Sequence, residues 1–196
     1  MERRKPKIYE DEAIVLDVFT PERPPKGVIV GRKWNMAHLL GTSHFTLLEA
    51  VFNPSSITLK TGSKVYIGKE VSRDVLRIVR RISYGELSES AKMELEQAVE
   101  TIVKENEERF VRFFNDSGPL TPRLHSLEVI PGVGKKMLLK ILNEREVELF
   151  KSFEDIQSRI GLSEPVKAVT KRVVEELRNP DNRHWLFVRP PSEHGP

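Results

Sequence analysis

The chain has 196 residues, a net charge of +3 and no cysteine. This length suits one large domain or two small ones, and the absence of cysteine excludes disulfides, thiolate metal sites and cysteine catalysis. No apolar run is long enough to span a membrane, and residues 1–10 are too charged for a secretion signal. We therefore expect a cytoplasmic protein with no membrane partner.

The charges are unevenly distributed along the chain. Residues 1–85 contain 15 basic and 9 acidic side chains, residues 86–126 contain 5 and 9, and residues 127–196 contain 12 and 11. The first segment is therefore basic, and an acidic segment follows it. A basic segment of this kind either faces an anionic partner or is simply a solvated surface, and charge alone leaves both readings open.

Residues 1–85 are expected to form a β domain. Apolar residues alternate with others in the runs 14–18, 45–52 and 76–84, and shorter apolar runs lie at 28–30 and 65–67. Proline and glycine separate these runs, as they do in the turns between strands. Five or six short strands in this length predict a small closed β-barrel, because closure removes exposed strand edges.

The period changes after this domain, and residues 86–118 are expected to contain one long connecting helix that begins after an N-cap at Ser88. An apolar stripe at helical spacing runs through Leu95, Ala98, Val99 and Ile102. Acid-first pairs four residues apart, which stabilise helices, are Glu100 with Lys104, Glu105 with Arg109, and Glu108 with Arg112. These signals together predict a continuous helix over residues 87–115.

Residues 119–180 are expected to form four short helices arranged as two copies of a helix, a glycine-containing turn and a second helix. In the first copy the helices are predicted over Pro122–Val129 and Lys135–Asn143, on either side of a turn at residues 130–134. The fold class predicted for the whole chain is therefore α+β.

The second copy has clear local signals. Ser152 is a suitable N-cap with Asp155 three residues later, a capping-box pattern. A turn at Gly161 leads to a helix with Pro165 in its first turn, where the missing N–H of proline costs nothing. Residues 181–196 are expected to be a tail.

The turn at residues 130–134 is the strongest candidate for a binding site. Glycines permit left-handed or close-approach backbone at low cost, so N–H groups at the start of the following helix can face a ligand. Unpaired N–H groups and the positive end of the helix dipole make an anion site there. A phosphodiester is the expected guest, and its contacts carry no sequence information. The candidate residues are Gly132, Val133, Gly134, Lys135, Lys136 and Lys140. Gly134 is expected to need a conformation open mainly to glycine.

The stretch Leu127–Lys136, followed by Leu138, resembles the helix-hairpin-helix signature of repair nucleases, junction-binding proteins and ligases. That resemblance implies non-sequence-specific binding of nucleic acid by paired turns. The second copy matches less closely, because it has one glycine, Gly161, and places Ser163 and Glu164 where basic residues would stand. Gly161 and Ser163 are therefore weaker candidates, and the second copy is expected to act mainly in packing.

The order of the whole chain also resembles an archaeal domain-of-unknown-function family described as RNA-binding, which favours RNA over DNA as the partner. The first domain is similar to an oligonucleotide-binding (OB) or S1-like barrel, most clearly over Lys60–Gly68. Such barrels bind single strands through aromatic residues in a basic groove. The candidates there are Arg32, Lys33, Trp34 and Lys64, with Phe45 and Tyr66. The alternative is that the aromatic residues belong to the core.

No catalytic motif is apparent in the sequence. A phosphate-binding P-loop would need glycine in place of Val129 and Ser or Thr in place of Lys136,. Asp11, Glu12 and Asp17 are too widely spaced along a strand to share one ion, and we expect them to face solvent. The chain is therefore predicted to be no enzyme, with no metal site and no cofactor.

The leading interpretation is a non-sequence-specific nucleic-acid-binding protein, with RNA or DNA as its partner. Two alternatives remain from the sequence. One is a protein-interaction module in a translation, transcription or repair complex, with ribosomal or repair proteins as partners. The other is an accessory DNA-binding subunit of a repair nuclease.

Overall fold

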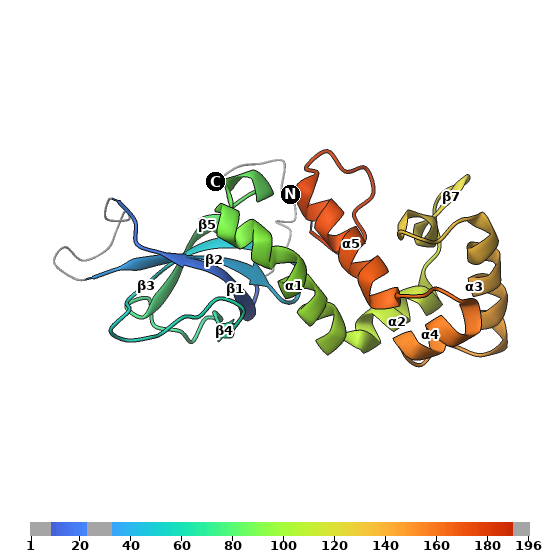
Figure 1. Ribbon diagram of the computed structural model, residues 1–196, viewed down its shortest axis with the longest axis horizontal. Coiled ribbons are helices and arrows are strands. Elements are labelled where there is room, and N and C mark those ends of the chain that lie inside the picture. Colours follow the sequence, from blue (N-terminus) through green and yellow to red (C-terminus); the bar gives the residue numbers. More distant parts are fainter. Residues whose placement is uncertain (1–8, 23–32, 190–196) are drawn as a thin grey trace, which may run out of the picture. The chain divides into compact units, whose positions relative to one another are not determined.

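The computed structural model describes residues 9–22 and 33–189, and it has a mixed α+β fold (Figure 1). Contacts divide the chain into two compact units, residues 1–95 and 96–196. Strands predominate in the first unit and helices in the second, as the change of period predicted. No helix in the described ranges has the length and hydropathy needed to cross a bilayer.

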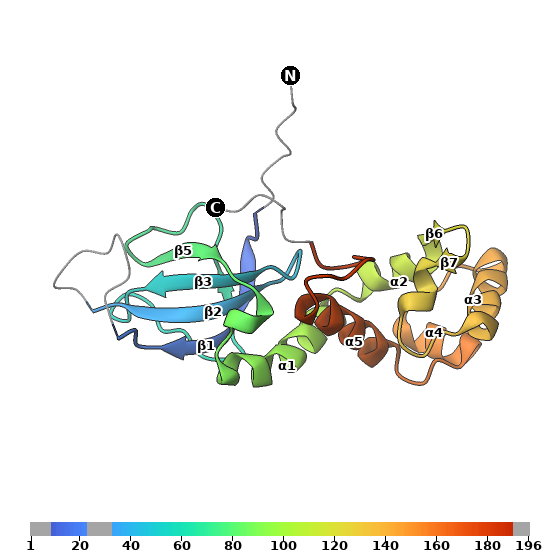
Figure 2. The same ribbon diagram turned by 90° about the horizontal axis from the view of Figure 1, so that it is seen from above.

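The first unit is built on a five-stranded antiparallel sheet. Its strands are β1 (Glu12–Phe19), β2 (Asn35–Gly41), β3 (Leu47–Phe52), β4 (Lys64–Tyr66) and β5 (Leu76–Arg81). Their order across the sheet is β4-β1-β2-β3-β5, and Figure 2 shows β1, β2, β3 and β5 side by side. The run 28–30, expected as a strand, lies outside the described residues.

The expected closed barrel is wrong. β4 and β5 are the two end strands, and no pairing joins them within the described parts of the chain. Closure needs the end strands to pair along their lengths, and β4 offers only three residues, which all pair with β1. β2 was not expected, because most of its residues form one continuous buried run instead of an alternation,.

The core of this sheet is made by alternate residues of all five strands. Its members from β2 to β5 include Leu39, Leu48, Phe52, Val65 and Leu76. Phe45 is also fully buried, which assigns this candidate to the core. It has a φ of +53° in the turn between β2 and β3. The Glu10 carboxylate holds this turn by accepting from the backbone N–H groups of Ser43 and His44, at 2.9 and 3.0 Å.

The expected long helix is two helices, α1 (Glu89–Glu105) and α2 (Glu107–Asp116), preceded by the 3-10 turn η1 (Tyr84–Glu86). Asn106 separates them, and its side-chain amide donates to the carbonyl of Ile102 at 2.9 Å. Asparagine competes for backbone hydrogen bonds in this way and weakens a helix interior. The predicted cap at Ser88 is confirmed, since its hydroxyl accepts from the Ala91 N–H at 3.1 Å.

The second unit contains β6 (Pro119–Thr121), β7 (Leu124–His125), the 3-10 turn η2 (Ser126–Val129), α3 (Lys135–Val147), α4 (Phe153–Ile160) and α5 (Pro165–Arg178). The helix expected over Pro122–Val129 is wrong, because a short hairpin and a 3-10 turn occupy this stretch. Pro122 disfavours helical backbone at Thr121, and β6 ends there.

The later helices agree with their sequence signals. The Ser152 hydroxyl accepts from the Asp155 N–H at 3.0 Å, and the Asp155 carboxylate reaches back to the N–H of Lys151. Pro165 is the first residue of α5. Local capping chemistry therefore determined where these two helices begin.

The chain after α5 is anchored by a buried ion pair. Glu176 is fully buried and accepts from the Arg172 guanidinium at 2.9 Å. The same carboxylate accepts from three successive backbone N–H groups, those of Leu186, Phe187 and Val188. The first part of the segment expected to be a tail, up to Val188, is thus fixed to α5.

Candidate nucleic-acid interface

The first turn, residues 130–134, positions the start of α3. Gly132 has a φ of +89°, the left-handed conformation that favours glycine,. Val133 is buried, and its N–H donates to the carbonyl of Ile130 at 3.0 Å. The N–H of Val133 is therefore occupied, and the expectation that it faces a ligand is wrong.

Gly134 has a different role from the one expected. It is the N-cap of α3 with a φ of −87° and a ψ of 176°, ordinary extended backbone. The position that needs glycine for its φ is Gly132. A side chain at Gly134 would nevertheless project into open space, because no atom of the described chain lies within 4 Å of its ideal Cβ position. Glycine there leaves the helix start uncovered.

The N-terminus of α3 has no side-chain cap and no acidic residue in its first turn. The first hydrogen bond of the helix runs from the N–H of Leu138 to the carbonyl of Gly134, at 2.8 Å. The N–H groups of Gly134, Lys135 and Lys136 donate to no described residue. Three backbone donors and the positive end of the helix dipole therefore face solvent together.

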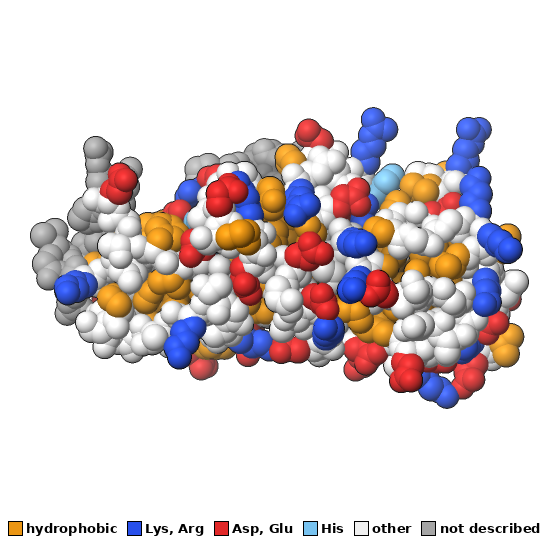
Figure 3. Space-filling view, in the orientation of Figure 1, with side chains coloured by type: hydrophobic (Ala, Val, Ile, Leu, Met, Phe, Trp, Pro, Cys, Tyr) orange, Lys and Arg blue, Asp and Glu red, His pale blue; other side chains and the backbone are white. Residues whose placement is uncertain are grey.

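Three lysines lie in the first two turns of α3. Lys135, Lys136 and Lys140 are exposed, and none of them forms an ion pair with a residue in the described ranges. Lysine and arginine side chains project along the outer edge of the second unit around α3 and β7 (Figure 3). The helix start thus combines unpaired backbone donors with unpaired cationic side chains, which together suit an anionic ligand.

The second turn, residues 160–164, has a similar backbone and different chemistry. Gly161 has a φ of +80°, and the buried Leu162 follows it, as Val133 follows Gly132. The two turns touch, since an ideal Cβ on Gly132 would lie 3.3 Å from Leu162 Cδ1. Ser163 is exposed beside them.

The start of α5 offers an anion little. The carboxylate of Glu164 lies 2.5 Å from Lys167 Nζ, so this cation is already paired. This pairing lowers the pKa of Glu164 and keeps it charged. Pro165 contributes no N–H. Of the two turns, only the first combines free donors with free cations.

The candidates of the first unit do not converge on one surface. Arg32 lies outside the described residues. Lys33 is exposed and Trp34 is half-buried, and both lie just before β2. Lys64 on β4 pairs with Ile14 on β1, and Ile14 pairs with Leu40, so Lys64 lies near the other end of β2. These ends are about 20 Å apart at ~3.3 Å per residue. Lys64 also pairs with Glu12 at 3.9 Å, and Tyr66 beside it is 46% exposed.

The acidic residues of β1 have separate partners. The Asp17 carboxylate accepts from the Ser88 hydroxyl at 2.6 Å, so it is not the solvent-facing residue that was expected. His38 nearby accepts from the N–H of Ser88 at 3.3 Å, and burial lowers its pKa. No cluster of three His, Asp or Glu side chains that could hold a metal ion is found in residues 9–22 and 33–189.

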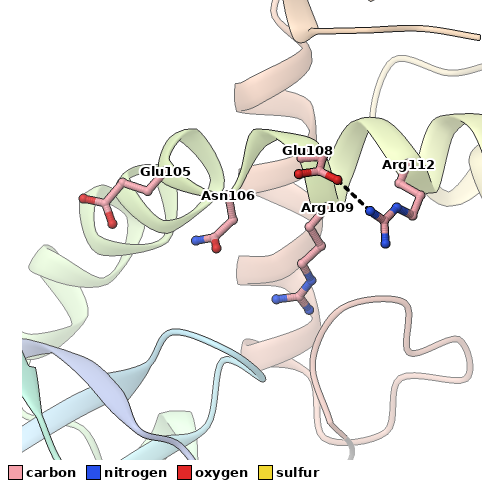
Figure 4. A pocket seen from close by; sticks show the side chains of 5 residues that line it. All are labelled: Glu105, Asn106, Glu108, Arg109 and Arg112. Carbon is pink, nitrogen blue, oxygen red and sulfur yellow. Dashed lines mark hydrogen bonds and ion pairs between the residues drawn. The ribbon is translucent and has the colours of Figure 1, made fainter.

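A shallow cavity of about 320 Å³ lies beside α2 and is lined by Glu105, Asn106, Glu108, Arg109 and Arg112 (Figure 4). The Arg112 guanidinium is held by Glu108 at 2.6 Å. Two carboxylates and two guanidinium groups therefore nearly cancel, and this cavity lacks the excess positive charge that a polyanion needs.

The arm, residues 119–125 of β6 and β7, was missed as a candidate because a helix was expected there. All five residues from Pro119 to Arg123 are exposed. Two prolines three residues apart, Pro119 and Pro122, were the available signal against a helix. Arg123 projects from the arm without an ion pair to any described residue.

The chain matches known proteins over almost its whole length. The family model described as a protein of unknown function (DUF655) matches residues 9–189. The uncharacterized protein MJ0038 of Methanocaldococcus jannaschii is 38% identical over 191 residues, which are 95% of this chain and 83% of that protein. The crystal structure of Af1531 from Archaeoglobus fulgidus is similar with a TM-score of 0.78 and 40% identity, over 92% of this chain and all of that one. The chain therefore belongs to the DUF655 family.

Proposed function

We propose that this protein binds nucleic acid without sequence specificity, and that the first turn and the start of α3 hold a backbone phosphate. The observation that carries this proposal is the uncapped helix start, where three unpaired N–H groups stand beside three unpaired lysines. A phosphodiester matches both features, because its oxygens accept hydrogen bonds and its charge is negative.

The chemistry of the site also explains the lack of sequence specificity. Backbone N–H groups and lysines contact phosphate oxygens, which are the same at every nucleotide. The absence of a Cβ at Gly134 lets the strand approach the helix start closely. RNA is the partner expected from the resemblance noted in the sequence, and the matched family itself is described as one of unknown function. The same contacts would hold DNA.

A binding assay with one sequence as single-stranded and duplex RNA and DNA, at several salt concentrations, tests this proposal. Non-specific affinity of order 10⁻⁴–10⁻⁶ M should appear at physiological salt and weaken steeply as salt rises. No binding at low salt, or an affinity that does not change with salt, would contradict the electrostatic mechanism.

A protein-interaction module is the second candidate function, and one observation favours it. Val147, the last residue of α3, and Leu149, which follows the helix, are 86% and 58% exposed, and Leu139 two turns earlier on α3 is 62% exposed. Exposed apolar side chains near one another are typical of protein contact sites. This function would be favoured if the protein bound no nucleic acid, and if it bound a protein partner equally well after the lysines were replaced.

A further inference from the structure

We infer that the arm formed by β6 and β7 is a second contact for the nucleic acid held at the first turn, with Arg123 on a phosphate and Leu120 against the sugar or base. This inference rests on the proposed function and adds a binding element to it. It commits to one ligand, a nucleic-acid strand that continues from the first turn across the arm.

The base of the arm is rigid. Pro119 pairs with His125 across the hairpin, and the hydroxyl and N–H of Ser126 both donate to the carbonyl of Gly118, at 2.7 and 3.0 Å. His125 Nδ1 accepts from the N–H of Leu127 at 3.1 Å and so caps η2. These bonds fix where the arm leaves the unit, so little ordering entropy is lost when its tip binds.

The outer part of the arm is left to solvent. The pairing slips by one residue between Pro119 and Thr121, a β-bulge that leaves Leu120 unpaired and 38% exposed. Bulges commonly redirect a side chain. No residue of the arm is acidic, and the exposed Arg123 has no ion pair within the described residues. A cation beside an exposed apolar side chain matches a nucleotide, whose phosphate is charged and whose base is largely apolar on its faces.

The arm is well placed to extend the site. β7 contacts η2, and η2 contacts α3, so the arm adjoins the elements that carry the first turn. The Arg145 guanidinium donates to the carbonyl of Ser117 at 2.9 Å, so the base of the arm lies beside the last turn of α3, about 15 Å along the helix from Lys135 at ~1.5 Å per residue,. By contrast, Arg109 and Arg112, two exposed arginines of α2, line a cavity together with the carboxylates of Glu105 and Glu108. A strand that runs from the first turn along α3 would therefore reach the arm at the other end of this helix.

The test is Arg123→Ala in the full chain, measured with single-stranded RNA at several salt concentrations. Loss of one phosphate contact should lower the log–log salt slope by about 0.7, and weaken binding about fivefold near 0.1 M salt. Arg123→Lys should restore the slope. Leu120→Ser should weaken binding with an unchanged slope, since it removes no charge. The matched control is Arg112→Ala, which also removes one exposed guanidinium and should change the slope little.

The outcomes separate this inference from the proposed function. If the parent protein binds no nucleic acid, the proposed function fails. If the parent binds nucleic acid and replacing Lys135 and Lys136 with alanine weakens that binding, but Arg123→Ala keeps the parental affinity and slope, then the arm is not a contact and only this inference fails. Equal losses in Arg123→Ala and Arg112→Ala would also overturn it, because general charge would then explain both. A circular dichroism melt confirms that each variant is folded.

Discussion

The two glycine turns of the second unit have nearly the same backbone, yet only one is equipped to bind an anion. Gly132 and Gly161 share a positive φ and are each followed by a buried apolar residue. The first turn then continues with Gly134 and two lysines, and the second with a serine and a carboxylate paired to Lys167. The backbone shape thus positions a helix start, and the next three residues decide whether an anion can bind there.

The largest effect is expected from removing the lysines of the first turn. Lys135→Ala with Lys136→Ala should weaken binding to single-stranded RNA about 25-fold near 0.1 M salt and lower the log–log slope by about 1.4, at 0.7 for each contact. The equivalent double variant at α5, Lys167→Ala with Lys171→Ala, is the control and should change both quantities far less. Equal effects at the two turns would remove the distinction between them.

Substituting the glycines should separate folding from binding. Gly161→Ala places a side chain at a φ of +80° and should lower the free energy of unfolding by about 1–2 kcal/mol,. Gly134→Ala, at a φ of −87° with open space around it, should lower the free energy of unfolding less, because it changes only the N-cap residue and adds no backbone strain,. Urea unfolding measures both changes. A strongly destabilised Gly134→Ala would contradict the geometry of the first turn.

A bulkier residue at Gly134 then tests close approach of the ligand. Gly134→Val should remain folded and bind RNA more weakly, because its side chain covers the helix start. Binding as tight as that of the parent would show that the strand does not contact this backbone.

The second turn can be tested in the opposite direction. Glu164→Lys removes the carboxylate that occupies the start of α5 and adds a cation there. If this carboxylate is what keeps phosphate away, the salt slope should steepen by up to about 0.7, with about fivefold tighter binding near 0.1 M salt. Glu175→Lys, at another exposed position of α5, controls for the added charge. Identical gains in both variants would mean that location does not matter.

The smallest effect is expected from pH, and it concerns the residue that caps η2 ahead of the first turn. Burial lowers the pKa of His125 below its ordinary 6.5, with the Arg145 guanidinium adding to the shift and Glu128 opposing it. Below 6.5 the unfolded chain therefore takes up a proton before the folded chain does, so stability falls as pH drops through this range. His125→Asn keeps a capping acceptor and should lose part of this dependence, measured by urea midpoints at pH 8 and pH 5.5. His38 retains its own contribution in the variant, because its pKa is lowered too. An unchanged dependence would show that His125 does not titrate differently on folding.

Most of the second unit could be predicted from the sequence, because its signals are local. Ser152 and Pro165 marked the starts of α4 and α5 through hydrogen bonds or dihedral limits within a few residues. The candidate turn was found in the same way, from glycines and lysines next to one another. The helix break and the hairpin at 119–125 also had local signals, which were Asn106 for the break and two prolines for the hairpin. The break was missed because the apolar stripe and the charge pairs on either side of Asn106 predicted one continuous helix.

The first unit was less predictable. Its strands are joined by bonds between distant residues, such as those from Glu10 to the turn at Ser43 and His44. A sequence pattern indicates that a strand exists, but not how far its partner extends. The sheet stays open because β4 has only three residues. Of the aromatic candidates, Phe45 lies in the core and Tyr66 on the surface.

The sequence by itself determined the α+β class, the starts of α3, α4 and α5 and the position of a basic glycine turn, since each depends on residues that are neighbours along the chain. Only the tertiary structure decided that Gly132 and not Gly134 takes the left-handed conformation. It also decided that Leu162 packs against Gly132 and that Arg123 stands on a projecting arm. These features depend on contacts between segments 20 or more residues apart, or on a competition between helix and hairpin that packing resolves.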